Sequence, residues 1–167
     1  MIIYILGTGY CGTTVLGLSL GANTQIVDMG EISHFLNFIN ENNIDNFFDK
    51  TICNCGKSIK ECNYWKDFYP ILKQNIHKSF VEKYDIHLNY FKTKYPNKLM
   101  VDSSMKLEYF NKIKDLEKVY PILLTKDVRN WSISVIKKHG GNVFRRFFQW
   151  YFFNRNFLEF DKKINFI

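Results

Sequence analysis

Short apolar runs alternate with longer amphipathic stretches along this chain. The runs cover residues 2–6, 24–29, 98–101 and 119–124, and each has the length of a buried strand. Between them, apolar residues recur three and four positions apart, which predicts helices over 12–20, 32–39, 64–76, 80–95 and 106–113. Strands separated by helices favour an α/β fold with a parallel sheet.

Three segments carry less regular patterns. The asparagine-rich residues 40–46 predict a loop, because asparagine has poor helix propensity. Pro121 requires the last strand to lie at a sheet edge, or the proline to stand at the strand entry. In the first helix, Val15, Leu16, Leu18 and Leu20 are expected to be mostly buried.

The segment 142–167 is crowded with phenylalanine, tyrosine and tryptophan and has almost no polar face. A helix of this kind must be covered. Packing in the core is the favoured expectation. The alternatives are a homodimer through this aromatic helix, an acceptor pocket with Arg145, Arg146 and Arg155 at its rim, and contact with a membrane surface.

Length and charge limit the class of protein. With 167 residues, 46% of them hydrophobic, the chain has enough apolar residues for one core and therefore one domain. Its net charge of +7 would attract a phosphorylated nucleotide, an anionic sugar, a nucleic acid or a membrane surface. Because the lysines are scattered, nucleic acid is not expected. No apolar run has the length of a transmembrane helix and no basic residue precedes the first strand, so we expect a cytoplasmic protein.

Residues 7–14 read GTGYCGTT and join the first strand to the first helix. A glycine-rich turn in this place points several backbone amides at one spot, and the helix N-terminus adds partial positive charge. The spacing of Gly7, Gly12 and Thr14 is that of the P-loop G-x-x-x-x-G-K-S/T, but Thr13 replaces the lysine. The sequence therefore predicts an anion site over residues 9–14, while glycines that merely permit a tight turn are the alternative.

A second polar turn follows the strand at 119–124. There Lys126 can neutralise a phosphate, Arg129 can bind one through two parallel hydrogen bonds, and Ser134 can donate its hydroxyl proton. Each also has a simpler interpretation. Lys126 and Arg129 would be a solvated pair, and Ser134 would bond to its own helix backbone.

Together these two segments resemble the sulfotransferase family that uses 3′-phosphoadenosine 5′-phosphosulfate. In that family a G-x-x-R/K-S/C-G-T-T loop holds the 5′-phosphosulfate. A later strand-turn-helix, with an arginine and a serine eight residues beyond it, holds the 3′-phosphate. Lys126 and Ser134 have this spacing. The resemblance implies a P-loop NTPase-like, three-layer α/β/α fold forming a single domain over 1–167, C-terminally short or a fragment. It assigns the nucleotide to Lys126, Arg129, Ser134 and the loop residues Gly9, Tyr10, Cys11, Gly12, Thr13 and Thr14.

Three smaller features extend the resemblance. Gly30-Glu31 resembles a G-E turn whose glutamate is the catalytic base, Asp102-Ser103-Ser104 resembles a D-x-S turn, and residues 53–65 resemble the C-x-C-G…E-C-x-F/Y-W insert of one bacterial branch. The implied reaction is metal-free transfer of a sulfuryl group to a hydroxyl or amine on a small-molecule, glycan or lipid acceptor. Glu31 would be the base, with His34 in reserve.

One residue departs from the family pattern. Tyr10 stands where many members have arginine or lysine, so the loop lacks a positive charge that steadies the leaving group. Either Lys57, Lys106 or Lys126 supplies that charge, or transfer is slow. A protein that binds the nucleotide without chemistry is the alternative function, and a P-loop kinase of small molecules is the third.

The four cysteines fall into two groups. Cys11 is expected to fit a tight space beside the phosphate. Cys53, Cys55 and Cys62 offer three thiolates for zinc, but a structural zinc site needs a fourth ligand and the chain has no C-x-x-C pair. The favoured expectation is therefore no metal, with reduced thiols or a redox-dependent disulfide instead.

Overall fold

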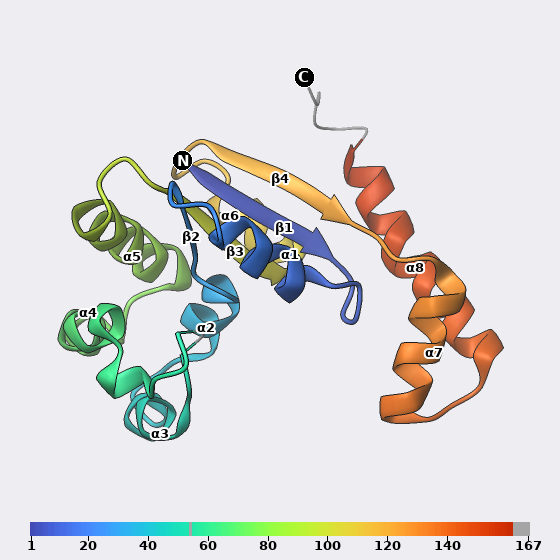
Figure 1. Ribbon diagram of the computed structural model, residues 1–167, viewed down its shortest axis with the longest axis horizontal. Helices are drawn as coiled ribbons and strands as arrows, with labels where there is room; N and C mark the ends of the chain where they lie inside the picture. The colour runs from blue at the N-terminus through green and yellow to red at the C-terminus, as the bar shows by residue number, and fades with distance from the viewer. Residues whose placement is uncertain (54, 162–167) are drawn as a thin grey trace.

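The computed structural model describes residues 1–53 and 55–161 and shows a four-stranded sheet flanked by helices (Figure 1). Its strands lie in the order β2-β3-β1-β4, and every pairing is parallel. The expected α/β class and parallel sheet are thus confirmed, and the layering is compatible with a three-layer fold. The strands are β1 (Ile2–Gly7), β2 (Ile26–Asp28), β3 (Leu99–Met105) and β4 (Val119–Leu124).

Helices connect the strands and extend past the last one. Helix α1 follows β1, α2 to α5 lie between β2 and β3, and α6 lies between β3 and β4. Helices α7 and α8 follow β4 and pack on each other beyond the end of that strand (Figure 1). Their bounds are α1 (Thr13–Gly21), α2 (Ile32–Phe38), α3 (Ile44–Lys50), α4 (Asn63–Gln74), α5 (Phe80–Lys94), α6 (Leu107–Ile113), α7 (Val128–His139) and α8 (Val143–Asp161), with the 3-10 turn η1 (Ile59–Glu61) before α4.

The core lies between one face of β1 and the helices α2 to α6. Alternate residues of β1 point to this face, and the ring centroid of Tyr4 lies 5.6 Å from that of Phe110 on α6. A second aromatic group joins α3, α4 and α5 around Phe68 and the fully buried His87. Ser79 and Glu82 cap α5 reciprocally, which fixes where that helix begins.

Helix α1 packs on the sheet through small residues. A Cβ atom on Gly17 would lie 3.0 Å from Oδ1 of Asp28, so α1 approaches β2 closely here and a side chain at this position would have to displace the Asp28 carboxylate. Thr13 and Gly17 are the buried residues of this helix. The expected burial of its apolar side chains is wrong for Val15 and Leu18, which are 68% and 50% exposed.

Two segments differ from their predicted structure. Residues 44–50 form helix α3, because Ile44 and Phe48 bury one face in spite of the asparagines before them. Strand β3 continues to Met105, so Asp102, Ser103 and Ser104 belong to a strand and not to a turn. All three are buried.

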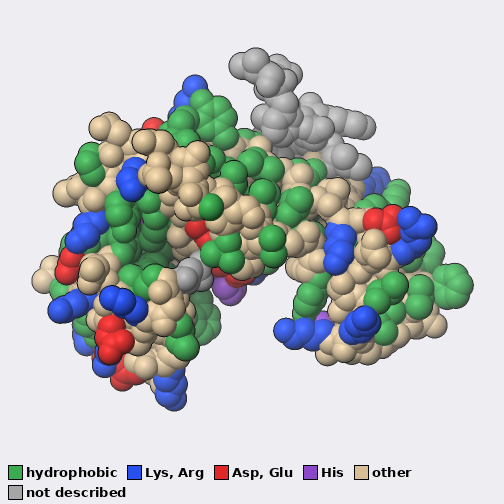
Figure 2. Space-filling view, viewed as in Figure 1, with side chains coloured by type: hydrophobic (Ala, Val, Ile, Leu, Met, Phe, Trp, Pro, Cys, Tyr) green, Lys and Arg blue, Asp and Glu red, His purple; other side chains and the backbone are tan. Residues whose placement is uncertain are grey.

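The aromatic helix α8 is covered only in part: Phe157 is buried and belongs to the core, as expected, but most of the helix is not covered by it. It packs against α7, and the indole Nε1 of Trp150 donates a hydrogen bond of 2.9 Å to the carbonyl oxygen of Lys126. Phe144, Phe148 and Phe152 remain 76%, 58% and 56% exposed, respectively, and Figure 2 shows hydrophobic side chains on the surface of this region. A homodimer through α8 stays a prediction, and residues 162–167 of the predicted segment lie outside the described residues.

Strand β4 is an edge strand, so Pro121 lies at the sheet edge as predicted. Within the described ranges, none of the helices combines the length and the apolar composition that crossing a membrane requires.

Candidate functional site

The carboxyl ends of the four strands open into one cavity. In the strand order β2-β3-β1-β4, the chain leaves β1 towards β2 and leaves β3 towards β4, so these two connections run in opposite directions. In open α/β sheets, ligands bind in the crevice between two such strands, at their carboxyl ends. The surface is hollowed between the α2 side and α7 (Figure 2). The cavity here measures about 340 Å³, and its lining consists of Tyr10, Gly12, Thr13, Thr14, Glu31, Met105 and Ser134.

The loop after β1 is held by close backbone packing. A Cβ atom on Gly7 would lie 2.8 Å from both Sγ of Cys11 and the carbonyl oxygen of Leu124. Gly12 has φ of 102°, a conformation that favours glycine, and it precedes α1 without a side-chain cap. The start of α1 therefore offers amides without a side-chain cap at the cavity, and among them the Thr13 amide also acts on the Cys11 thiol and lowers its pKa.

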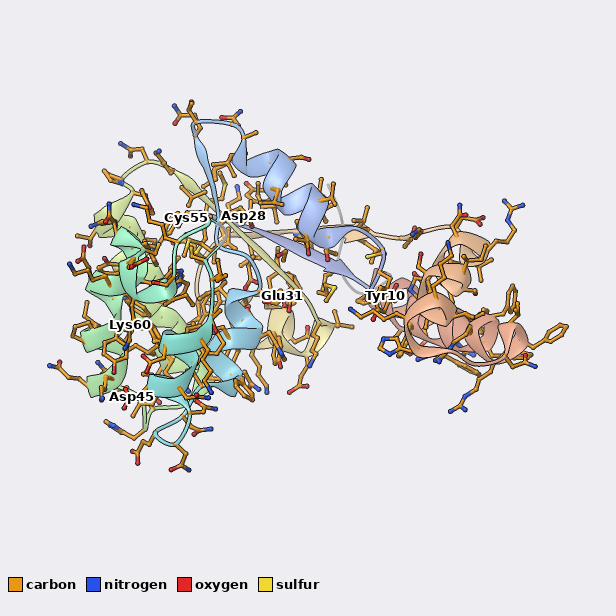
Figure 3. All side chains as sticks on the ribbon, turned by 60° about the horizontal axis from the view of Figure 1, so that its bottom comes forward. Tyr10, Asp28, Glu31, Asp45, Cys55 and Lys60 are labelled. Atoms are coloured by element: carbon orange, nitrogen blue, oxygen red, sulfur yellow. The ribbon has the colours of Figure 1, made fainter. Side chains whose placement is uncertain are left out.

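Tyr10 leans away from the strand ends. Its hydroxyl forms a short hydrogen bond with Nε2 of His139, and the Lys138 ammonium lies 5.9 Å from its ring centroid. Figure 3 shows Tyr10 on the loop that faces α7, with Glu31 on the other side of the strand ends. Tyr10 thus lines the cavity while its hydroxyl is occupied by α7.

Lys126 and Ser134 meet beside the loop. The Lys126 ammonium donates a hydrogen bond of 3.0 Å to the Ser134 hydroxyl, which in turn donates to the carbonyl oxygen of Asn130 at 2.8 Å. Burial raises the pKa of the Cys11 thiol, and the charge of Lys126 is among the influences that lower it. Lys126 therefore acts electrostatically on the loop, although Ser134 also makes the backbone bond of the simpler interpretation.

Arg129 lies outside this group. Its side chain is 85% exposed and pairs with Asp127, with 3.0 Å between Nε and Oδ1. Asp127 also accepts the Arg129 amide and caps α7, and these bonds hold the pKa of its carboxyl below the usual range. Arg129 does not line the cavity, and its geometry matches the solvated alternative.

Glu31 stands at the start of α2, exposed, and its position is set by a buried carboxylate. Asp102 on β3 accepts hydrogen bonds from the hydroxyls of Ser33 and Ser104. The Ser104 hydroxyl also accepts the amide of His34 at 3.1 Å. These bonds tie the first turn of α2 to β3, and burial raises the pKa of Asp102 to about 6. The D-x-S pattern marked Asp102 and Ser104, but not Ser33 and not their part in positioning Glu31.

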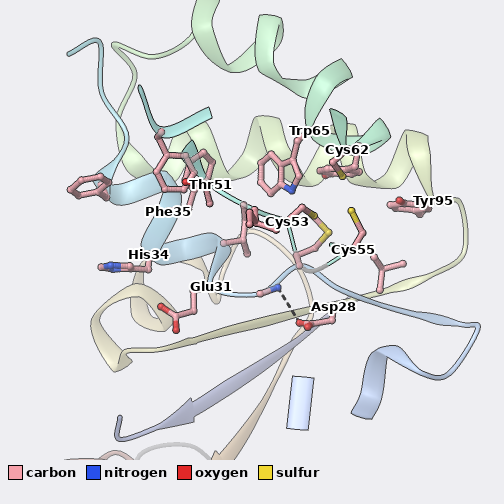
Figure 4. A pocket seen from close by; sticks show the side chains of 18 residues that line it. Asp28, Glu31, His34, Phe35, Thr51, Cys53, Cys55, Cys62, Trp65 and Tyr95 are labelled. Atoms are coloured by element: carbon pink, nitrogen blue, oxygen red, sulfur yellow. Dashed lines mark hydrogen bonds between the residues drawn. The ribbon is translucent and has the colours of Figure 1, made fainter. Parts of the chain in front are cut away.

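A second, larger cavity of about 530 Å³ opens on the other side of Glu31 (Figure 4). It extends over α2, the segment after α3 and the start of α4, and aromatic side chains such as Phe35, Trp65 and Tyr95 line it. Glu31 lines both cavities.

His34 lines the larger cavity and not the smaller one. Its Nδ1 lies 3.4 Å from the Tyr109 hydroxyl. His34, the expected reserve base, therefore lies on the side away from the loop.

The three remaining cysteines form part of the wall of the larger cavity. Cys53, Cys55 and Cys62 have sulfur atoms within 4.8 Å of one another. Burial raises the pKa of Cys53 to about 12, whereas the backbone amide of Lys57 lowers the pKa of the exposed Cys55. From the sequence spacing, three converging thiolates were only the alternative to reduced thiols or a disulfide.

No protein-family model, curated protein or solved structure matches this chain. The geometry of the two cavities and of the residues between them is therefore the basis for assigning a function.

Proposed function

We propose that this chain is a sulfotransferase that moves a sulfuryl group from 3′-phosphoadenosine 5′-phosphosulfate to a hydroxyl or amine acceptor. The observation that carries the proposal is the position of Glu31 between two cavities. One is lined by a glycine-rich loop and the other by aromatic side chains. A transferase needs this arrangement, because donor and acceptor must approach one base from separate sites.

The donor occupies the smaller cavity in this proposal. The loop amides of residues 9–14, apart from that of Cys11, which donates to the carbonyl oxygen of Thr8, hold the 5′-phosphosulfate. The hydroxyls of Thr13 and Thr14 and the N-terminus of α1 help. Lys126 and Ser134, which already contact each other, hold the 3′-phosphate. Lys126 is also the cation that compensates for Tyr10, since its charge reaches the loop. Lys106, by contrast, contacts the hydroxyl and ring of Tyr109.

The transfer step then runs in line. The acceptor oxygen or nitrogen forms a bond to sulfur while the bond from sulfur to the bridging phosphate oxygen breaks, and that oxygen keeps the electron pair. Glu31 takes the acceptor proton, and adenosine 3′,5′-bisphosphate leaves. The loop amides stabilise the charge that develops on the departing phosphate.

The larger cavity suggests the kind of acceptor. Because Phe35, Phe38, Trp65 and Tyr95 line it, an acceptor with an apolar or aromatic body fits better than an uncharged sugar alone. We therefore place hydrophobic alcohols and lipids first among the acceptor classes.

Calorimetry with adenosine 3′,5′-bisphosphate tests the donor site. We expect the parent chain to bind, and Lys126→Ala and Ser134→Ala to weaken binding by about tenfold and about fivefold, because each removes a phosphate contact. Lys137→Ala removes the same charge from an exposed position on α7 and is the matched control. Absence of binding by the parent chain would refute the proposal.

A transfer assay with a radiolabelled donor tests Glu31. We expect Glu31→Gln to bind the nucleotide as the parent does and to lose transfer at least a hundredfold, in line with removal of a general base. Glu41→Gln, an exposed carboxylate outside both cavities, is the control. Transfer by Glu31→Gln at the parent rate would show that Glu31 is not the base.

Nucleotide binding without transfer is the second candidate. The pairing of Tyr10 with His139 favours it, because the loop position that is basic in the sulfotransferases contributes no charge here. Tight binding of the bisphosphate together with no transfer to aromatic, aliphatic or amine acceptors would select this candidate.

A further inference from the structure

Three thiols converge on one point in the wall of the larger cavity. The sulfur atoms of Cys53, Cys55 and Cys62 lie within 4.8 Å of one another (Figure 4). Zinc binds thiolates at about 2.3 Å in a tetrahedron, which places the sulfurs about 3.8 Å apart. The sulfur atoms therefore need to move only slightly closer together to take the spacing of a zinc site.

The backbone around the first two cysteines is shaped to present both sulfurs. The Cys53 amide donates to the carbonyl oxygen of Lys57 at 2.8 Å, and the Gly56 amide donates to the carbonyl oxygen of Cys53 at 2.8 Å. Gly56 has φ of 83°, which favours glycine, and Ile52 pairs with Ser58 in an antiparallel bridge. These bonds close a tight knuckle between α3 and η1.

Cys53 and Cys55 lie two positions apart on this turn, with Cys53 half-buried and Cys55 exposed. Cys62, buried at the start of α4, supplies the third sulfur from a separate element.

We propose that Cys53, Cys55 and Cys62 bind one Zn²⁺, with the fourth position directed to the larger cavity and filled by water or by a ligand group that enters it. Within residues 1–53 and 55–161 no histidine, aspartate, glutamate or fourth cysteine joins the group. Three protein ligands with one open position are typical of zinc sites that contact a substrate. The inference does not depend on the proposed nucleotide site, because that cavity contains none of these cysteines, but they border the cavity proposed for the acceptor.

A disulfide is the competing outcome. It would join two of the three sulfurs and leave the third unpaired, whereas the metal would use all three. The two outcomes differ in mass and in metal content, so one set of measurements separates them.

Metal analysis of the full chain, purified without chelator and in the presence of a reductant, is the first test. We expect about one zinc per chain, and a loss of most of it in Cys53→Ser, Cys55→Ser and Cys62→Ser. Cys11→Ser, which changes the free cysteine of the loop, is the matched control and should retain zinc. Equal zinc in all four variants would overturn the proposal.

Cobalt substitution of the parent chain is the second test and does not depend on a variant that folds. We expect Co²⁺ to give the visible bands of a tetrahedral site and strong near-ultraviolet thiolate-to-metal absorption, both removed by Zn²⁺. Failure to take up either metal under reducing conditions would overturn the proposal. So would a mass two hydrogens below that of the reduced chain after purification under reductant, since it would show a disulfide.

Discussion

The indole Nε1 of Trp131 donates a hydrogen bond to the carbonyl oxygen of Gly9 at a distance of 2.7 Å. Trp131 is buried on α7, and Gly9 belongs to the glycine-rich loop after β1. This bond joins the two segments that the sequence marks as phosphate sites. The position of the loop therefore depends on a helix that follows it by more than a hundred residues.

Replacing the indole by a ring without a donor should weaken nucleotide binding. In Trp131→Phe the carbonyl of Gly9 loses its partner, and one hydrogen bond contributes about 1 kcal/mol, so we expect about fivefold weaker binding of adenosine 3′,5′-bisphosphate. Calorimetry measures the affinity, and thermal unfolding checks that the variant is folded. An affinity equal to that of the parent would show that the bond does not position the loop.

Gly7 has no room for a side chain. Its Cβ would lie 2.8 Å from the carbonyl oxygen of Leu124 and from Sγ of Cys11, so strand β4 or the loop must move. We expect Gly7→Ala to lower the free energy of unfolding by about 1–3 kcal/mol. Gly9→Ala is the control, because nothing lies within 4 Å of its Cβ, and it should change stability by less than about 0.5 kcal/mol. Urea unfolding measures both free energies, and equal values for the two variants would contradict the steric argument for Gly7.

Asp102 makes stability fall as the pH rises. Burial raises its pKa from 3.8 to about 6, so the folded chain binds its proton more tightly than the unfolded chain. The stabilisation is complete below the unfolded pKa and is lost as the pH rises through about 6. Asp102→Asn serves as the reference, because asparagine does not titrate. The free energy of unfolding of the parent, measured relative to this variant, should fall by roughly 3 kcal/mol between about pH 3 and pH 7. Urea unfolding across this range measures the difference, and a constant difference would contradict the assignment.

His87 should have the opposite effect. Burial lowers its pKa from 6.5 to about 3, so the unfolded chain takes up a proton that the folded chain excludes, and stability falls as the pH decreases from about 6.5. The Tyr64 hydroxyl bonds to Nε2 of His87 at 2.9 Å, while Nδ1 has no hydrogen-bond partner among the residues that the structure describes. The double variant Tyr64→Phe, His87→Phe removes these polar atoms together.

We expect the double variant to unfold in acid at a lower pH than the parent. At about pH 4 its free energy of unfolding should have decreased by roughly 3 kcal/mol less than that of the parent. Circular dichroism against pH gives the two midpoints. Tyr64→Phe alone is the control, since it keeps the imidazole and should retain the acid sensitivity of the parent. Coincident midpoints for parent and double variant would mean that His87 does not control acid unfolding.

Local signals determined much of this fold. Apolar runs marked the four strands and glycines marked the turn before α1, because strand burial and tight turns depend on neighbouring residues. The same signals placed Gly12 and Glu31 in the turns after β1 and β2, and Ser134 in the helix that follows β4. Since parallel strands end at one edge of a sheet, their approach to one cavity followed from the order of elements.

Tertiary packing decided what local patterns do not contain. The sequence could not show that Arg129 pairs with Asp127 and leaves the cavity, or that Glu31 borders a second cavity. It treated Asp102 as part of a turn and expected a covered α8, whereas Asp102 is a buried strand residue and several aromatic side chains of α8 are exposed. In each case the outcome depends on which remote element lies against the side chain. Periodicity along the chain carries no information on that contact, and only the packed structure specifies it.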